Sequence, residues 1–376
     1  MDDVVDGSLV IQRAGRRNRN YKVYRRGRSG LFVKQVPVVV TETVASILQE
    51  AQFYQLAYQS EAFEPLRPHL LELYDYDARI HALTLSLVPD CENLTQLRLR
   101  LGSLPSGIAR SLGRVLGTAH LSGARLVAGG VRDAGLFPGK RPWIFDVAQH
   151  AETLFGAHPS GGTQQLVATL RQTPALVAAL AQLGNEWRTI SLHHGDIKWD
   201  NFVVCKDASL EDASAVRLVD WELSDLGDPG WDVGALLASF VQFWVATMSP
   251  DASQLDDLHL VLNAPLKLDD LWPAVVDFWL SYSDTVGLAG AEAASELERH
   301  VRFAGARLAL SAFEVAHPAA AAGRTAHMFL RLAVGILSDP GRACRELFGL
   351  DPVRQQLCGT KSHRGRGTTN QREVRP

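Results

Sequence analysis

Cysteines are few in this sequence, and they are widely scattered. Four occur in 376 residues, at Cys91, Cys205, Cys344 and Cys358, and none has C-x-x-C spacing. That spacing is typical of zinc sites and redox motifs, so its lack argues against both. The scattered cysteines also argue against a disulfide framework and are compatible with the reducing cytoplasm, where we expect this protein.

Long apolar runs are also missing. The most apolar uncharged run is 233–250, and Gln242, Ser249 and Pro250 interrupt it. A membrane-spanning helix needs roughly 20 consecutive apolar residues, so a core helix is predicted instead and no membrane partner is expected. The first three residues, Met-Asp-Asp, are acidic and lack the basic-then-apolar order of a signal peptide.

The sequence has little net charge. A formal charge of −3 creates no strong field toward nucleic acid or membrane. The basic segment 12–28 has only Tyr21 and Tyr24 to stack on bases, which is weak support for a nucleic-acid binder. The hydrophobic share of 46% is that of a globular protein with a sizeable core, and the length allows two lobes. We therefore expect no nucleic-acid partner.

The sequence does contain two polar turns, each beside an apolar strand. The first, within 193–204, reads H-G-D-x-x-x-x-N and contains Asp196 and Asn201. The second, within 216–222, places Asp220 at the end of a short apolar run. One Asp that orients and deprotonates a hydroxyl, with an Asn and an Asp that hold Mg²⁺ against nucleotide phosphates, suits phosphoryl transfer.

The two turns resemble the kinase signatures H-R-D-x-x-x-x-N and D-F-G. Gly195 replaces the Arg of protein kinases, and Trp221-Glu222 replaces Phe-Gly. This form is similar to the aminoglycoside phosphotransferase and choline kinase-like families, and the segment G-D-P-G-W-D-V-G at 227–234 extends the resemblance. The resemblance implies an α+β, protein-kinase-like bilobal fold. It has an N-lobe of a small antiparallel β-sheet with one helix, and a larger, mostly helical C-lobe.

The expected organisation follows from the apolar spacing and this resemblance. The N-lobe is expected over 1–88 and the C-lobe over 89–355, with a disordered basic tail at 356–376. The C-lobe would include the catalytic loop 193–204, the metal-binding strand 216–222 and a helical acceptor subdomain. The individual elements expected are strands at 9–11, 21–24, 31–35, 70–75 and 80–88, and helices at 43–59, 108–120, 164–183 and within 236–345. A turn at 76–78 is expected to join the last two strands.

In the N-lobe, the resemblance implies an ATP site. Lys34 on the third strand would bind the α- and β-phosphates, with Lys22 as the rival lysine. Glu50 on the following helix would pair with the lysine, and Glu42 is the weaker alternative. The remaining nucleotide contacts are assigned to the loop side chains of Asn18 and Asn20 and to the backbone of Ser86, Leu87 and Val88.

In the C-lobe, the resemblance implies that Asp196 is the catalytic acid–base residue, while Asn201 and Asp220 hold Mg²⁺. His194 and Asp232 are predicted to be structural, holding the catalytic loop in place. Lys198 stands where protein Ser/Thr kinases carry a Lys that touches the γ-phosphate and the substrate hydroxyl. The alternative for Lys198, a solvated turn residue, stays open.

The acceptor is left with two candidates. Lys198 and the segment 227–233 resemble, less specifically, the stand-alone kinases that phosphorylate Ser/Thr of precursor peptides in lanthipeptide and thioamitide pathways, where a partner lyase removes the phosphate. The rival acceptor is a small hydroxylated molecule such as an aminoglycoside, a macrolide, choline or a sugar. A non-catalytic nucleotide-binding scaffold is a third hypothesis, against which the presence of Asp196, Asn201 and Asp220 argues.

Other C-lobe side chains have both an ordinary and a functional interpretation. His120 is expected to be a core or capping residue. The aromatic residues are expected to pack in the core, with an acceptor pocket as the alternative, and the acidic pairs to be solvated, with cation binding as the alternative. These aromatic and acidic residues are Phe240, Phe243, Trp244, Trp272, Asp256, Asp257, Asp269 and Asp270.

Overall fold

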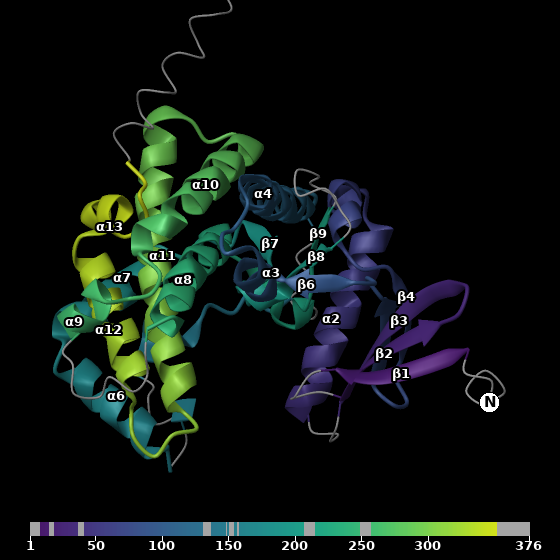
Figure 1. Ribbon diagram of the computed structural model, residues 1–376, viewed down its shortest axis with the longest axis horizontal. Coiled ribbons are helices and arrows are strands. Elements are labelled where there is room, and N and C mark those ends of the chain that lie inside the picture. The colour runs from purple at the N-terminus through teal and green to yellow at the C-terminus, as the bar shows by residue number, and fades with distance from the viewer. Residues whose placement is uncertain are drawn as a thin grey trace, which may run out of the picture.

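The structure is a computed structural model that describes residues 8–14, 19–36, 41–130, 137–147, 149, 154–155, 158–206, 215–248 and 257–351. The predictions made for Asn18, Asp256 and the tail 356–376 fall outside these residues. The described chain has an antiparallel sheet at one end and a helical bundle at the other (Figure 1). The α+β, bilobal kinase-like fold is therefore confirmed.

The N-lobe is a five-stranded antiparallel sheet with the strand order β1-β2-β3-β5-β4. The strands are β1 (Leu9–Ala14), β2 (Arg19–Arg25), β3 (Arg28–Gln35), β4 (Leu73–Asp77) and β5 (Ala82–Ser86). Helix α2 (Thr41–Gln59) buries Phe53, Tyr54 and Ala57 and is followed by the short helix η1 (Glu61–His69). The sheet and α2 form the right-hand part of Figure 1.

The turn between β4 and β5 lies later than the sequence analysis placed it. Tyr76 and Asp77, expected in the turn, are paired in the ladder with Leu83 and Ala82. The Asp77 carboxylate accepts a hydrogen bond from the Arg79 amide at 2.9 Å, so the turn forms around the side chain of the last paired residue. The turn predicted at 76–78 was therefore placed too early in the chain.

Two small sheets connect the lobes and contain the catalytic motifs. One has the order β6-β8-β9 and the other pairs β7 with β10. Their bounds are β6 (Cys91–Asn93), β7 (Ser191–His193), β8 (Phe202–Cys205), β9 (Val216–Leu218) and β10 (Asp225–Gly227). In Figure 1 the labels β6 to β9 lie between the large sheet and the helices. The polar turns of the motif therefore lie between the lobes.

The C-lobe contains helix α8 (Pro229–Ala246), which is buried along most of its length. The others are α3 (Leu94–Leu101), α4 (Ser106–Ala128), α6 (Gly161–Arg171), α7 (Pro174–Asn185), α9 (Asp257–Leu262), α10 (Trp272–Val286), α11 (Gly290–Ala316), α12 (Arg324–Ser338) and α13 (Pro340–Glu346). Short 3-10 turns are η2 (Trp143–Asp146), η3 (Trp199–Asn201), η5 (Trp221–Leu223) and η6 (Leu268–Leu271).

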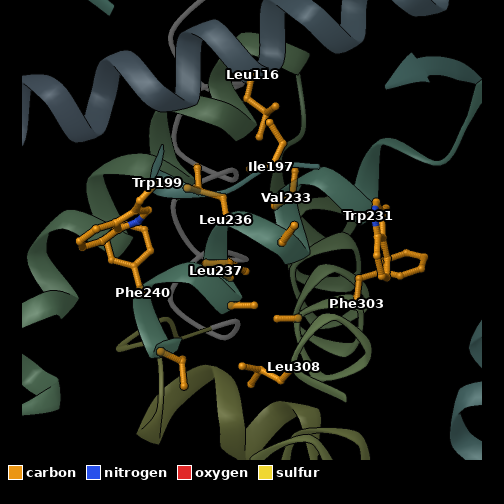
Figure 2. Packing of buried hydrophobic residues seen from close by; sticks show 14 of the residues in the cluster. Leu116, Ile197, Trp199, Trp231, Val233, Leu236, Leu237, Phe240, Phe303 and Leu308 are labelled. Carbon is orange, nitrogen blue, oxygen red and sulfur yellow. The ribbon is translucent and has the colours of Figure 1, made fainter. Parts of the chain in front are cut away.

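Helix α8 joins the catalytic loop to the rest of the C-lobe core. Figure 2 shows Val233 and Leu236 of α8 near Ile197 of the catalytic loop and Leu116 of α4. The same apolar cluster includes Leu308 of α11, and all five side chains are essentially inaccessible to solvent. Because interiors are close-packed, the loop is held by the core that surrounds α8.

Two helix predictions are corrected by the structure. The expected single helix 164–183 is two helices, α6 and α7, which meet at a bend of 92°. Pro174 is the first residue of α7, and it lacks the amide that a continuous helix would need. Helix α8 starts at Pro229, not after Asp232, because Asp228 caps it by accepting a hydrogen bond from the Gly230 amide.

One finding bears on the prediction that the chain has no membrane-spanning helix. Within the described residues no single helix is long and apolar enough to cross a bilayer, and only the bent pair of α6 and α7 meets the length and composition criteria together.

Candidate active site

The catalytic loop follows β7 and begins with a tight backbone turn at Gly195. This residue has φ +82°, and a Cβ built on it would lie 2.3 Å from the Leu223 carbonyl oxygen. A left-handed backbone is costly for any residue with a Cβ, and here no space exists for one. The packing explains why this chain has Gly at the position where protein kinases have Arg.

Asp232 holds the loop from the first turn of α8. Its carboxylate accepts hydrogen bonds from the backbone amides of His194 at 2.7 Å and Gly195 at 2.9 Å. Burial alone would raise the pKa of Asp232, but the hydrogen bond with His120 and the neighbouring imidazoles lower this pKa to about 2. The Trp231 indole adds a hydrogen bond to the Gly195 carbonyl at 3.2 Å. These contacts suit the structural role predicted for Asp232.

His194 connects the two motif segments. Its Nδ1 accepts from the Asp196 amide at 3.3 Å, and its Nε2 donates to the Val219 carbonyl at 2.9 Å. The imidazole also lies against the Trp221 ring, with 4.6 Å between the centroids. One side chain therefore places Asp196 relative to the residue before Asp220, which suits the predicted structural role of His194.

The Asp196 carboxylate has cationic side chains near both of its oxygens. Lys198 Nζ lies 2.5 Å from Oδ2, and Arg307 of α11 lies 3.9 Å from Oδ1. Burial lowers the pKa of Lys198, but the Asp196 charge outweighs it and the net shift is upward. Asn201 donates to the Asp196 backbone carbonyl at 2.8 Å, which brings the first Asp and the Asn of the motif together.

Lys34 lies on the opposite side of the cleft, between two carboxylates. Its ammonium is 2.5 Å from Glu50 and also contacts Asp220. Burial lowers the pKa of Lys34, yet the two carboxylates together raise it. The lysine that joins the lobes is therefore Lys34 and not Lys22, and the predicted helix Glu is the one beside it.

The pKa values of the two acids that contact Lys34 are shifted in opposite directions. Burial raises the pKa of Glu50 to about 7, against the opposing effect of Lys34. For Asp220, burial is outweighed by Lys34, so its pKa is lowered. Asp220 also adopts a left-handed backbone, with φ 71° and ψ 53°. Strain of this kind in a non-glycine residue is commonly found at functional sites.

Helix α2 is attached to the segment after Asp220. The Phe53 and Trp221 rings stack with centroids 3.8 Å apart, and Ser46 Oγ donates to Glu222 at 2.7 Å. Gln49 adds a hydrogen bond to the Ser224 carbonyl at 2.8 Å. Trp at the position of the kinase Phe thus connects α2, which positions Glu50, to the metal-binding strand predicted at 216–222.

The residues around Asp220 offer ligands of the type that Mg²⁺ prefers. Carboxylate oxygens of Glu50, Asp220 and Glu222 all lie within 4.8 Å of one another, and the Val219 amide donates to the Asn201 backbone carbonyl, which places Asn201 beside this strand. Hard oxygen donors, with Asp220 kept ionised, fit a divalent cation. Glu222 was missed in the sequence analysis although it belongs to the D-W-E motif, because the kinase signature has Gly there.

The segment 86–88, predicted to contact the adenine, has two backbone amides that already donate hydrogen bonds within the protein. The Ser86 amide donates to the Glu72 carbonyl at 2.8 Å and the Leu87 amide to the Gly30 carbonyl at 3.1 Å. Of the three residues, Val88 is the one whose amide makes no hydrogen bond within the described part of the chain. Asn20 lies opposite Lys34 in the β2–β3 ladder, with its Oδ1 buried and unpaired among described residues.

Three of the remaining candidates pack in the core, and one lines a cavity. Phe240 and Phe243 pack against Trp199, and His120 is buried between Tyr282 and Asp232, as expected for core residues. Trp244 lines a cavity of about 550 Å³ formed mainly by α12 and α13, which none of the predicted catalytic or nucleotide residues lines.

The last of these candidates are Trp272 and the acidic pairs. The Trp272 indole donates to the Leu347 carbonyl at 3.2 Å. Asp270 accepts from the Lys267 amide at 3.1 Å, so one acid of its pair has a local structural partner.

The comparison with family models identifies the class of protein. A model described as the phosphotransferase enzyme family matches residues 10–265, so the chain belongs to that family. It is an enzyme that moves phosphoryl groups to hydroxyl acceptors, which makes it a kinase, and the suspected aminoglycoside phosphotransferase and choline kinase-like relationship is confirmed. A search of curated proteins found no match.

Solved structures agree on the fold at low sequence identity. Choline kinase LicA from Streptococcus pneumoniae is 14% identical with a TM-score of 0.50, covering 90% of this chain and 96% of its own. Choline kinase from Cryptosporidium parvum Iowa II is 11% identical with a TM-score of 0.52, covering 90% and 91%. The GDP complex of a point mutant of an aminoglycoside 2'-phosphotransferase is 11% identical with a TM-score of 0.52, covering 92% and 96%.

Proposed function

We propose that this kinase uses ATP and Mg²⁺ and transfers the γ-phosphate to an acceptor hydroxyl that is bound at Asp196. The observation that carries the proposal is the placement of Lys34 between Glu50 and Asp220, with Asp196 in the loop that His194 links to the Asp220 strand. Phosphoryl transfer depends mainly on positioning and on stabilising charge, and these residues supply fixed charges from both lobes.

The nucleotide half of the site comprises β3, α2 and the strand that ends at Asp220. Lys34 offers a positive charge to the α- and β-phosphates, and Glu50 keeps that ammonium in place. Asp220 and Asn201, with Glu222 as an additional oxygen donor, are the residues that would hold Mg²⁺, which neutralises phosphate charge when it is bound. The Val88 backbone is the contact we assign to the adenine edge.

The acceptor half comprises the catalytic loop. Asp196 orients the acceptor hydroxyl and takes its proton as the new bond forms between that oxygen and the γ-phosphorus. The bond between the γ-phosphorus and the bridging oxygen breaks, and ADP leaves. Lys198 is close enough to Asp196 to contact both the hydroxyl and the transferred phosphoryl group. His194 and Asp232 hold the loop in this arrangement.

For the acceptor, Ser or Thr of a precursor peptide is the first candidate. Its support is the position of Lys198, which contacts Asp196 at 2.5 Å as expected for a lysine that participates in transfer to a peptide hydroxyl. In a lanthipeptide-like pathway a partner lyase would then eliminate the phosphate. A small hydroxylated molecule is the second candidate, because the solved structures with this fold include choline kinases and an aminoglycoside phosphotransferase.

The test is a transfer assay followed by mass spectrometry. The protein is offered Mg²⁺ and ATP with Ser/Thr peptides in one arm and with aminoglycosides, macrolides, choline and sugars in the other. A mass increase of one phosphate on an acceptor, abolished in Asp196→Ala, supports the proposal and tells which acceptor class applies. Binding of ATP without transfer to any member of either arm would favour the non-catalytic scaffold.

A further inference from the structure

Arg307 brings a second cation to the catalytic carboxylate from a distant part of the chain. It lies on α11, more than 100 residues after Asp196, and its side chain is buried. One guanidinium nitrogen, Nη1, donates to Ser311 at 2.7 Å and to Glu314 at 2.9 Å on the same helix. The other nitrogen, Nη2, faces Asp196 Oδ1 at 3.9 Å.

The two guanidinium nitrogens therefore differ in how they are bound. Nη1 is held by partners on α11, and Gln242 of α8 fixes Ser311 by donating to it at 2.7 Å. Nη2 makes no hydrogen bond within the described residues, since 3.9 Å is an ion-pair contact and too long for one. An N–H donor group on a rigidly held arginine thus remains available beside the oxygen that would receive the acceptor hydroxyl.

The charges around Asp196 have a consequence for the acceptor. An acceptor whose hydroxyl reaches Oδ1 brings its neighbouring substituent close to Arg307, with Lys198 on the other oxygen. Glu314 contacts Arg307 only through Nη1, and its side chain is half exposed, so Nη2 still presents positive charge toward the acceptor. A cationic substituent beside Nη2 would be repelled, while an anionic one would gain a charge-assisted hydrogen bond. Because Nη1 is already bound on α11, the contact would be a single charge-assisted hydrogen bond from Nη2 to one oxygen of a carboxylate or phosphate.

We propose that Arg307 determines specificity for an acceptor with an anionic group, a carboxylate or phosphate, next to the hydroxyl that is phosphorylated. This inference rests on the proposed kinase function and names its substrate class. The same chemistry has two sources, an acidic residue beside Ser/Thr in a peptide or a small hydroxy acid. It disfavours acceptors that carry an ammonium group beside the reacting hydroxyl.

Two acceptor series, in which the substituent near the reacting hydroxyl is anionic, neutral or cationic, test the inference. The small series is glycerate, glycerol and 3-amino-1,2-propanediol, and the peptide series is acetyl-Ala-Ser-X-amide with X as Asp, Ala or Lys. We measure kcat and KM with Mg²⁺ and ATP by ADP release and confirm products by mass spectrometry. A charged hydrogen bond contributes about 1.5–3 kcal/mol, so kcat/KM should fall roughly tenfold to a hundredfold from the anionic to the neutral member. The cationic member should be worse still.

Variants identify Arg307 as the cause of this preference. Arg307→Gln should remove most of the anionic advantage through KM, and Arg307→Glu should reverse the order toward the cationic member. Arg302→Gln is the matched control, because Arg302 is on the same helix but pairs with Glu186 at 2.6 Å. ATP binding and thermal melting are measured for each variant. If a variant does not fold, the order of the wild-type acceptors alone decides the charge preference.

The outcomes separate this inference from the function on which it rests. Transfer that favours the anionic member in one series and loses that preference in Arg307→Gln supports the inference, and the series that works identifies the source. Equal transfer to all three members, or a preference for the cationic one, overturns the inference and leaves the kinase function standing. No transfer to any of the six acceptors, with ATP bound, counts against the proposed function itself.

Discussion

Each half of the site contains a lysine paired with a carboxylate, but the two pairs differ in their exposure to solvent. Lys34 and Glu50 are almost inaccessible, with side-chain exposures of 7% and 1%. Lys198 and Asp196 are more open, at 40% and 15%. Buried charges need partners to be tolerated, whereas exposed pairs contribute little to stability. We infer that the nucleotide half is both structural and functional, while the acceptor half is mainly functional.

The largest effect is expected at the open half. Replacing Asp196 by Asn removes the proposed proton acceptor and keeps the side-chain size. General-base catalysis contributes about 10²–10⁴-fold, so kcat should fall by that factor with little change in melting temperature. Phosphoryl transfer to the acceptor that the transfer assay identifies, measured together with thermal unfolding, checks both parts. A large loss of stability would contradict the assignment of Asp196 to function alone.

The buried half should respond in stability as well as in activity. Lys34→Met leaves Glu50 buried without its cation, and breaking a buried pair costs about 3–5 kcal/mol. We expect a lower free energy of unfolding in urea and a large loss of ATP binding. The double variant Lys34→Met/Glu50→Gln should recover much of the stability and none of the activity. Equal instability of the single and double variants would show that the pair does not act as a unit.

The tight turn at Gly195 in the catalytic loop should tolerate no larger side chain. Gly195→Ala forces a Cβ into a left-handed backbone, which costs roughly 1–2 kcal/mol, before the contact with the Leu223 carbonyl is added. We expect a loss of more than about 2 kcal/mol in unfolding free energy together with reduced transfer. Gly102→Ala also lies at positive φ but has open space around it, so it is the control for strain without a clash. Equal losses in the two variants would contradict the packing explanation.

The anchor of the loop should make stability sensitive to acid. The pKa of Asp232 is about 2 in the folded state and 3.8 ordinarily, so its stabilising contribution is present above pH 4 and is lost as pH falls toward 2. The shift corresponds to about 2 kcal/mol. Urea unfolding between pH 5 and pH 2 should show this slope, flattened in Asp232→Asn. Asp77, whose pKa is also about 2 but which remains accessible to solvent, should matter little in Asp77→Asn.

Part of the site could be predicted from the sequence. Asp196, Asn201 and Asp220 were identified because they lie in short motifs whose order and spacing are specific. Lys34 was separated from Lys22 by resemblance alone, and the structure supplies the physical reason, which is contact with two carboxylates. Pro174 at the start of α7 explains why the single helix expected at 164–183 is two helices.

Other features could not be predicted because they depend on long-range packing. Arg307 is one of many charged residues on an amphipathic helix, and nothing in its neighbourhood in the sequence points to Asp196. Its position is set by the packing of α11 on α8, where Phe303 lies against Gly234. The stacking of Phe53 on Trp221 joins residues of different lobes for the same reason. The proposed contact of Arg307 with the acceptor therefore follows from the three-dimensional structure and not from the sequence.

The most direct test of the account is calorimetric titration of ATP, with and without Mg²⁺, into the wild type, Asp196→Asn and Asp220→Asn. If the two halves act separately, Asp196→Asn should bind the nucleotide with wild-type affinity and keep the gain in affinity that Mg²⁺ gives. Asp220→Asn should lose most of that gain, because Asp220 is the ionised carboxylate beside Lys34. Nucleotide binding that is lost equally in both variants, or in neither, would contradict the division into a nucleotide half and an acceptor half.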